Sequence, residues 1–181
     1  MANICVFCGA RDGSNPLYRE LAIKIGNSIA SRGHNLIYGG GNRGLMGAVA
    51  AGVRENGGKV IGVMPRFLER KERDGTILYE SDELIYIETM DERKTILYGR
   101  ADIIITLPGG CGTMDEFFEV LTLRQLSQHE KPIGILNVEG YYNPLISYLH
   151  HMVEEGFVSV SDMDLIIVRD EVEDLLDSLG V

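Results

Sequence analysis

The chain has 181 residues, with 27 acidic and 17 basic side chains, so its formal net charge at pH 7 is −10. This acidity disfavours binding to nucleic acid or to an anionic membrane, because each of these partners needs a basic protein surface. The sequence shows neither an apolar run of the roughly 20 residues that a membrane span needs nor a signal-peptide start. We therefore expect a cytoplasmic protein with a single domain over residues 1–181.

Apolar runs that predict strands alternate with helical patterns along the whole chain. The predicted strands are residues 4–7, 35–38, 59–63, 84–87, 103–107, 132–136 and 165–168, and the predicted helices are residues 16–31, 44–56, 90–100, 114–129, 142–155 and 172–179. Strands that are apolar on both faces, each followed by a helix, indicate a mostly parallel sheet covered on both sides. The expected fold is a single doubly wound, Rossmann-like α/β domain with about seven strands, which binds ligands at the carboxyl ends of its strands.

One stretch does not fit this alternation. Residues 65–81 are largely charged and carry few apolar side chains. This composition is equally typical of a lid over a binding site and of an ordinary surface loop.

The three cysteines form an odd count in a chain without a visible secretion signal, which is typical of a reducing compartment. Cys5 and Cys8 belong to the first predicted strand and have no second pair of cysteines or histidines nearby. We therefore expect two buried thiols and no metal site. Cys111 has no histidine near it in the sequence, which disfavours cysteine–histidine catalysis.

A glycine-rich loop follows the second predicted strand, at residues 39–47. Gly39, Gly41 and Gly44 match the G-x-G-x-x-G pattern of dinucleotide-binding folds. A nicotinamide cofactor is disfavoured because the loop follows the second strand rather than the first, and because no acid ends the next strand to hold a ribose hydroxyl. Close approach of the loop to a mononucleotide explains the glycines better. The sequence lacks G-x-x-x-x-G-K-[ST], which excludes a P-loop NTPase.

A second glycine-rich turn, Pro-Gly-Gly-Cys-Gly-Thr-Met-Asp-Glu at residues 108–116, joins a buried strand to a helix. The free N–H groups and the dipole at a helix N-terminus both favour an anion, so this turn predicts a phosphate site. Glu116 then has two interpretations. Thr113-x-x-Glu116 matches a capping box, in which the acid only satisfies the helix N-terminus. The same carboxylate could instead stabilise positive charge that develops on a sugar during cleavage.

A charged cluster at residues 89–94 begins another predicted helix. Thr89-x-x-Glu92 matches a capping box, which places Arg93 and Lys94 in early turns where the helix dipole disfavours positive charge. Their placement is explained if they reach an anion. The alternative is a solvated charged face, with Asp91 and Glu92 as their partners.

Together these motifs resemble the LOG ("Lonely guy") family of cytokinin riboside 5′-monophosphate phosphoribohydrolases, whose members are often mislabelled lysine decarboxylases. The resemblance covers nearly the whole chain and includes Cys8-Gly9-Ala10, Tyr38-Gly39-Gly40-Gly41, Gly44-Leu45-Met46-Gly47, Glu92-Arg93-Lys94 and the signature P-G-G-x-G-T-x-x-E at residues 108–116. It implies hydrolysis of the N-glycosidic bond of a purine nucleoside 5′-monophosphate, AMP or an N6-substituted AMP, to free base and ribose 5-phosphate. It implies no metal, no nicotinamide and no pyridoxal phosphate.

The resemblance also implies roles for individual residues. Arg93 and Glu116 match the catalytic residues of the family. The expected substrate-binding residues are Ser14, Gly40, Gly41, Met90, Lys94, Gly109, Gly110, Gly112, Thr113, Asp115 and Thr122. Asp91 stands where many relatives carry histidine, and the segment 65–83 is slightly longer than in the family, so the role of Glu72 as a ribose contact is not carried over.

Two classes of function stay open from the sequence: the hydrolase, and a nucleotide- or cofactor-binding carrier of the same fold. The presence of both Arg93 and Glu116 favours the enzyme, because a carrier needs the phosphate cradle but not the carboxylate. An amino-acid decarboxylase would need a pyridoxal lysine and a partner for the pyridinium nitrogen, and no lysine here stands in such a setting.

The helix that follows the signature is apolar around much of its circumference at residues 117–123. This pattern, with the habit of the family, predicts a symmetric homodimer whose interface lies next to the site. Deep burial of the helix inside one subunit is the alternative.

Overall fold

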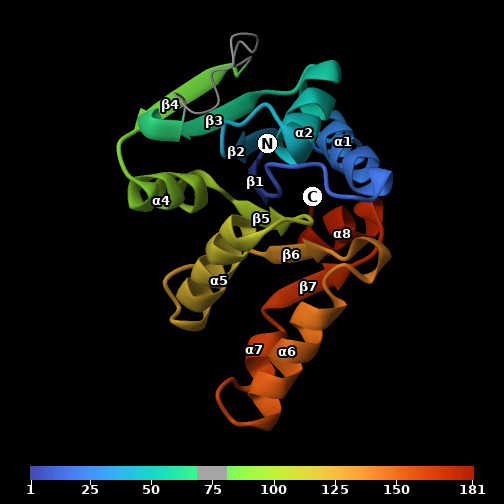
Figure 1. Cartoon of the computed structure of the whole chain (residues 1–181), viewed down its shortest axis with the longest axis vertical. Helices are drawn as coiled ribbons and strands as arrows, with labels where there is room; N and C mark the ends of the chain where they lie inside the picture. Colours follow the sequence, from blue (N-terminus) through green and yellow to red (C-terminus); the bar gives the residue numbers. More distant parts are fainter. Residues whose placement is uncertain (69–80) are drawn as a thin grey trace.

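The structure, a computed structural model, describes residues 1–68 and 81–181. In these residues, seven strands form one sheet in the order β4-β3-β2-β1-β5-β6-β7, and all neighbouring strands are parallel (Figure 1). The strands are β1 (Asn3–Phe7), β2 (Asn35–Tyr38), β3 (Val60–Pro65), β4 (Glu83–Ile87), β5 (Ile103–Thr106), β6 (Ile133–Leu136) and β7 (Ile166–Arg169). The predicted doubly wound α/β fold is confirmed.

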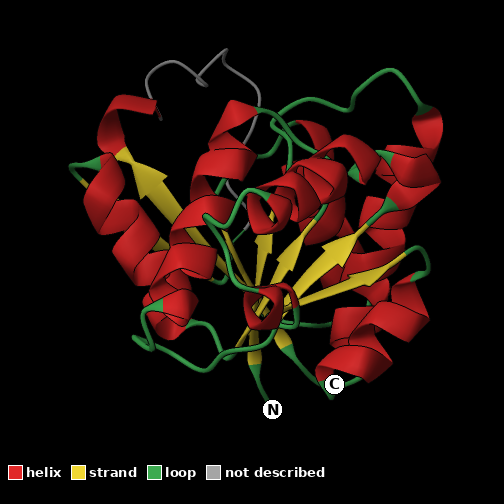
Figure 2. Ribbon diagram, turned by 90° about the horizontal axis from the view of Figure 1, so that it is seen from below, coloured by secondary structure: helices red, strands yellow, loops and turns green. Residues whose placement is uncertain are grey.

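Helices cover both faces of the sheet (Figure 2). One face carries α1 (Pro16–Ser31), α2 (Gly44–Glu55) and α8 (Val172–Leu179), and the other carries α4 (Met90–Arg100), α5 (Cys111–Gln125) and α6 (Asn143–Glu154). A 3-10 turn, η1 (Val138–Gly140), precedes α6, and the short helix α7 (Val160–Met163) contacts α6. In the described part of the chain, no helix has the length and apolar character to cross a membrane.

Strand β1 illustrates how the sequence builds two apolar layers. Ile4 and Val6 belong to the core cluster under α1, α2 and α8, while Cys5 and Phe7 belong to the cluster under α4, α5 and α6. Successive side chains of a strand point to opposite faces of the sheet, so a continuous apolar run supplies both layers.

The strand order reverses beside β1, and this reversal positions the ligand site. The chain moves outward from β1 to β4, then returns to place β5 on the other side of β1. The loops that leave β1 and β5 meet there, where the N–H of Gly9 donates to the carbonyl of Pro108 at 3.0 Å. In doubly wound folds, ligands bind in the crevice at such a switch point.

Helix α5 differs from its predicted bounds at both ends. It begins at Cys111 rather than at residue 114, because Gly110 takes the extended N-cap conformation with φ −99° and ψ −155°. It ends at Gln125 rather than at residue 129, because the positive φ of Ser127, 55°, breaks the helical backbone.

The predicted irregular segment at residues 65–81 is described only at its ends. Strand β3 continues to Pro65, and residues 66–68 are helical. Residues 69–80, with Glu72, lie outside the described residues, so neither the lid nor the loop interpretation is tested.

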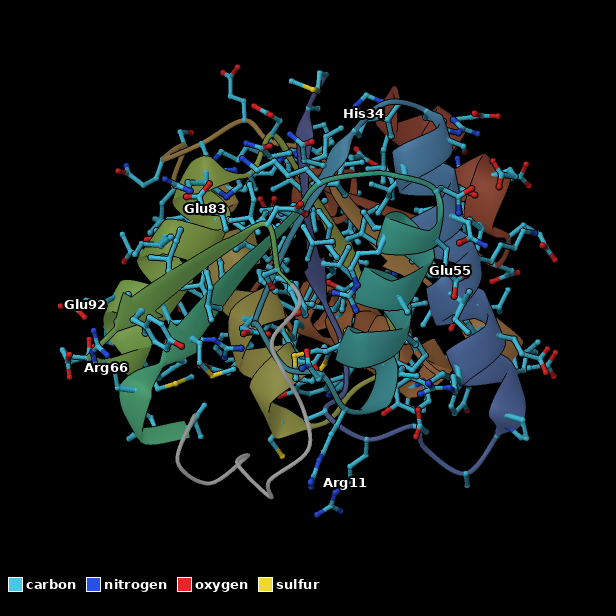
Figure 3. The ribbon with its side chains drawn as sticks, turned by 90° about the horizontal axis from the view of Figure 1, so that it is seen from above. Arg11, His34, Glu55, Arg66, Glu83 and Glu92 are labelled. Atoms are coloured by element: carbon cyan, nitrogen blue, oxygen red, sulfur yellow. The ribbon has the colours of Figure 1, made fainter. Side chains whose placement is uncertain are left out.

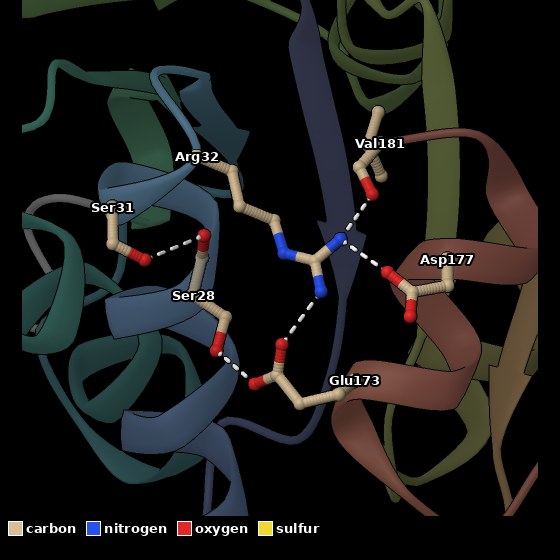
Figure 4. Close-up of polar contacts among 6 residues, drawn as sticks. All are labelled: Ser28, Ser31, Arg32, Glu173, Asp177 and Val181. Atoms are coloured by element: carbon tan, nitrogen blue, oxygen red, sulfur yellow. Dashed lines mark hydrogen bonds and ion pairs between the residues drawn. The ribbon is translucent and has the colours of Figure 1, made fainter.

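A polar cluster joins the C-terminal end of α1 to α8 and to the last residue (Figure 4). Arg32 donates from Nη1 to Asp177 at 2.7 Å and to the carbonyl of Val181, and from Nη2 to Glu173 at 2.7 Å. Ser28 donates to the second oxygen of Glu173 at 2.6 Å. One guanidinium therefore fixes segments that lie at opposite ends of the sequence.

We predict that Arg32→Met lowers the free energy of unfolding by about 1–2 kcal/mol, because several charge-assisted hydrogen bonds are lost together while the apolar stem is kept. Urea unfolding monitored by circular dichroism measures the loss. Arg19→Met is the matched control, since Arg19 forms one exposed pair with Asp12 at 2.7 Å, a class of pair that contributes little. Equal losses in the two variants would contradict the role of the cluster.

Candidate active site

A cavity of about 560 Å³ opens at the carboxyl ends of β1, β2, β3 and β5. Its wall combines the loop after β1, the ends of β2 and β3, the signature turn and one side of α5. The lining residues are Cys8, Gly9, Ala10, Arg11, Asp12, Gly13, Tyr18, Gly39, Leu45, Met46, Met64, Leu68, Arg93, Pro108, Gly109, Gly110, Gly112, Thr113, Glu116 and Tyr141.

Arg93 is a buried cation in this wall, with 8% of its surface exposed. Its Nε donates to the carbonyl of Val63 at 3.3 Å, its Nη2 donates to the carbonyl of Gly39 at 3.1 Å, and its Nη1 donates to Oε1 of Glu116 at 3.3 Å. A Cβ at position 39 would collide with Nη2, so the guanidinium can keep this position only beside glycine. The predicted capping box of Thr89 and Glu92 is confirmed, and it places Arg93 in the second turn of α4.

Glu116 lies in the second turn of α5, with 11% of its side chain exposed. Burial raises the pKa of this carboxyl to about 7, and the neighbouring guanidinium of Arg93 opposes the rise. Glu116 therefore changes charge near neutral pH, which is the range that suits a group that exchanges protons during a reaction.

The capping-box interpretation of Glu116 is wrong. Helix α5 begins before Thr113, with Gly110 as its N-cap, and no described side chain forms the cap hydrogen bond. Thr113 packs against Gly109 instead, where any Cβ would collide with its side chain. The carboxylate of Glu116 is left to pair with Arg93.

The N-terminus of α5 forms the part of the cavity suited to an anion. Its first N–H groups lack a side-chain cap among the described residues. A Cβ added at Gly110 or Gly112 would meet no described atom within 4 Å, so both glycines border open space in the cavity wall. Free N–H groups and the helix dipole favour a phosphate at this point.

The structure brings together six of the expected site residues in the cavity wall: Arg93, Glu116, Gly109, Gly110, Gly112 and Thr113. The others do not line it. Ser14 is exposed before α1, Met90 is exposed at the start of α4, and Gly40 and Gly41 are buried beyond the lining Gly39. Their roles in substrate binding stay predictions.

Lys94 and Asp115 belong to a different surface. The Nζ of Lys94 lies 2.5 Å from Oε2 of Glu119 and 3.3 Å from Oδ2 of Asp115. Asp115, Glu119 and Thr122 line a shallow hollow of about 470 Å³ on the outer side of α5. Arg93 and Lys94 thus reach carboxylates of α5, and their interpretation as a solvated face paired with Asp91 and Glu92 is wrong.

Several cavity residues were not among the predicted site residues, and Arg11, Tyr18 and Tyr141 are three of them. Arg11 is exposed and projects outward from the loop after β1 (Figure 3). With Arg93, it is one of the two cations in the cavity wall as far as the structure describes it. Its position just after the first strand, at the ligand-binding edge of this fold class, was a usable signal. No local signal marked Tyr18 and Tyr141, because the residues that they contact are distant from them in the sequence.

Metal-binding residues do not gather in the part of the chain that the structure describes: it holds no group of three or more His, Cys, Asp or Glu that could bind an ion. All three cysteines are free thiols. Cys5 and Cys8 are buried, as predicted, and burial raises the pKa of both thiols well above the ordinary range. Cys8 therefore contributes a neutral wall to the cavity.

Comparisons with known proteins identify relatives of the whole chain. A family model described as "Possible lysine decarboxylase" matches residues 46–179. The chain is 41% identical to cytokinin riboside 5′-monophosphate phosphoribohydrolase LOG3 of Arabidopsis thaliana, over 97% of this chain and 80% of that protein. It is 42% identical to LOG4 of the same plant over the same shares, and 40% identical to the probable enzyme LOGL2 of Oryza sativa subsp. japonica, over 97% and 71%.

Solved structures give a more distant likeness. The molybdenum cofactor carrier protein from Chlamydomonas reinhardtii superimposes with a TM-score of 0.73 at 20% identity, covering 99% of this chain and 96% of that one. The molybdenum cofactor binding protein from Rippkaea orientalis gives 0.72 at 21% identity, covering 99% and 98%. These likenesses show the fold alone. Identity of 40–42% along almost the whole chain, together with the family model that matches residues 46–179, shows that this chain belongs to the LOG family of cytokinin riboside 5′-monophosphate phosphoribohydrolases.

Proposed function

We propose that this protein hydrolyses the N-glycosidic bond of a purine nucleoside 5′-monophosphate, AMP or an N6-substituted AMP such as cytokinin riboside monophosphate. The products are the free base and ribose 5-phosphate. The observation that carries the proposal is the buried Arg93–Glu116 pair, which shares a cavity with the open N-terminus of α5. The names of the plant relatives support this substrate class. The free thiols support a cytoplasmic location.

The 5′-phosphate binds at the N-terminus of α5. The donors there are the backbone N–H groups at Gly110 and Gly112 and the hydroxyl of Thr113. Arg11 lies at the rim of the cavity and is the more exposed of its two described cations. Backbone amides suit this task in an acidic protein, because they attract the phosphate without requiring a basic surface.

Cleavage builds positive charge on the ribose ring, and the ionised carboxylate of Glu116 stabilises that charge. The oxygen of a water molecule bonds to C1′, and the C1′–N bond breaks with its electrons passing to the base. Glu116 takes the proton released by the water and returns one to the departing base. Arg93 holds the carboxylate in place, because two backbone carbonyls fix its own guanidinium.

Two other functions share parts of this site. A carrier of the same fold would use the phosphate cradle but has no need of a carboxylate with a raised pKa beside a fixed arginine. A pyridoxal-dependent decarboxylase needs a lysine in its site, and among the described lining residues of the cavity there is no lysine. The hydrolase accounts for the carboxylate as well as for the cradle.

The first prediction concerns the form of the substrate. We expect AMP or an N6-substituted AMP to be cleaved and the matching nucleoside to be left intact, because the donors at the start of α5 would face no acceptor without the phosphate. Chromatography of free base after incubation with a panel of nucleosides and their monophosphates measures this. Equal turnover of adenosine and AMP would refute the assignment of the cradle.

The second prediction separates chemistry from folding at Glu116. Glu116→Gln keeps the size of the side chain but cannot balance positive charge or accept a proton, so turnover should fall by about 100-fold or more. Isothermal titration calorimetry should still show nucleotide binding. Glu119→Gln, on the outer side of the same helix, is the control and should retain most activity. A parent-like rate in Glu116→Gln would move the catalytic carboxylate elsewhere.

The raised pKa gives the same variant a second readout. Glu116 binds its proton more tightly in the folded chain, where its pKa is about 7 against an ordinary 4.5. The protonated carboxyl therefore contributes its full stability to the fold below pH 4.5, and this stability is lost as the pH rises through about 7. Glutamine stays neutral, so the melting temperature of the variant should match the parent at low pH and exceed it above neutrality. The parent rate should fall on acidification through the same range. A parent rate that rises on acidification would contradict a carboxylate role.

The third prediction concerns assembly, which we propose to be a homodimer. Half-buried Phe118 and Leu123 line the hollow on the outer side of α5 together with Thr122, and exposed Leu126 follows at the C-cap of the helix. Thr122→Arg would place a charge in that face and should convert a dimeric mass in light scattering to a monomeric one. Ser147→Arg, on an exposed position of α6, should leave the mass unchanged. A parent that is monomeric at micromolar concentration would refute the dimer.

A further inference from the structure

Two consecutive tyrosines donate hydrogen bonds to the backbone where strand β5 leads into the signature turn. The hydroxyl of Tyr142 donates to the carbonyl of Leu107 at 2.6 Å, and the hydroxyl of Tyr141 donates to the carbonyl of Gly109 at 2.5 Å. Between them, the carbonyl of Pro108 accepts from the N–H of Gly9 at 3.0 Å. Three successive carbonyls, those of Leu107, Pro108 and Gly109, thus accept hydrogen bonds from within the protein.

These bonds orient the peptide planes of the turn. In a trans peptide, the N–H of one residue points away from the carbonyl of the residue before it. Fixing the carbonyl of Gly109 on the Tyr141 side therefore directs the N–H of Gly110 the opposite way, and Gly110 is the N-cap of α5. The Tyr141 hydroxyl also occupies a carbonyl oxygen that would otherwise repel an approaching anion.

The two tyrosines differ in burial, which separates their roles. Tyr142 is 2% exposed and belongs to the core beneath α4, α5 and α6. Tyr141 is 38% exposed and lines the cavity, and its ring packs edge-on against Tyr18 at 5.6 Å and Tyr142 at 4.9 Å between centroids. Its ring is therefore held in place by aromatic packing, and its hydroxyl bond serves the turn rather than the core.

We propose that Tyr141 is a positioning residue for phosphate recognition. Its hydroxyl holds the Gly109–Gly110 peptide so that the N–H of Gly110 is ready to donate to the 5′-phosphate, which removes the cost of reorienting the turn on binding. The inference rests on the proposed function in that it names the phosphate of the same substrate. Its effect is on binding, not on the bond-breaking step.

Tyr141→Phe tests the proposal, because it removes only the hydroxyl and keeps the edge-on packing of the ring. We expect the affinity for ribose 5-phosphate, measured by calorimetry, to fall by about 3- to 10-fold, the range of one lost hydrogen bond. With AMP as substrate, KM should rise by a similar factor while kcat changes by less than about twofold. In ¹⁵N NMR, addition of ribose 5-phosphate should shift the Gly110 amide strongly in the parent and less in the variant.

Two control variants distinguish a positioning role from a general structural one. Tyr148→Phe, on an exposed position of α6, should behave as the parent in every assay. Tyr142→Phe leaves the buried carbonyl of Leu107 without its partner and should mainly lower the melting temperature. Unchanged KM and phosphate affinity in Tyr141→Phe, or a loss confined to kcat, would overturn the proposal. If the parent binds ribose 5-phosphate but cleaves no monophosphate, the proposed function fails, and the calorimetry and the NMR shift still decide the role of Tyr141.

Discussion

The burial of the Arg93 guanidinium constrains the elements that surround it. A cation this far from water is tolerated only when its donors are satisfied, and its partners come from three elements: the carbonyl of Gly39 after β2, the carbonyl of Val63 in β3 and the carboxylate of Glu116 in α5. The capping box sets where helix α4 starts, and glycine at position 39 leaves room for the guanidinium in this position. One side chain thus fixes the spacing of two strands and two helices around the cavity.

A second constraint is that a chain of net charge −10 offers few cations to the phosphate of the proposed substrate. Lys94 forms ion pairs with two carboxylates of α5 and does not line the cavity. The cations among the described residues of the cavity wall are therefore Arg11 and Arg93, and Arg93 is paired with Glu116. Backbone N–H groups supply the hydrogen-bond donors that cationic side chains would otherwise provide. The glycines at the start of α5 leave open space around unsatisfied N–H groups, and hydrogen bonds from Gly9 and Tyr141 hold the preceding carbonyls. In the proposed site, rigid amides would attract the phosphate while the surface stays acidic.

The sequence was sufficient to predict the fold because both faces of its central strands are buried. Runs such as β5 are apolar at successive positions, and alternation with helices leaves few other architectures. The glycine-rich turn and the two catalytic candidates were also visible locally. The pairing of Glu116 was not, because the start of α5 depends on the backbone conformation of Gly110, and the partner depends on how α4 lies against α5. Tyr141 acts across 32 positions of sequence, a distance at which no local pattern carries information.

The environment of Glu116 shows a conflict between stability and function. Burial favours its protonated form, while Arg93 favours its ionised form, and burial has the larger effect on its pKa. An exposed capping glutamate would have satisfied the helix at no such cost, yet the chain places the acid one turn deeper, against a fixed guanidinium. A carboxylate that is destabilised by its surroundings gains most when positive charge appears beside it, because it recovers an interaction that the solvent no longer provides. In the proposed hydrolase, the energy withheld from folding at this position would be available to a cationic transition state, which is expected where a functional site departs from an otherwise consistent fold.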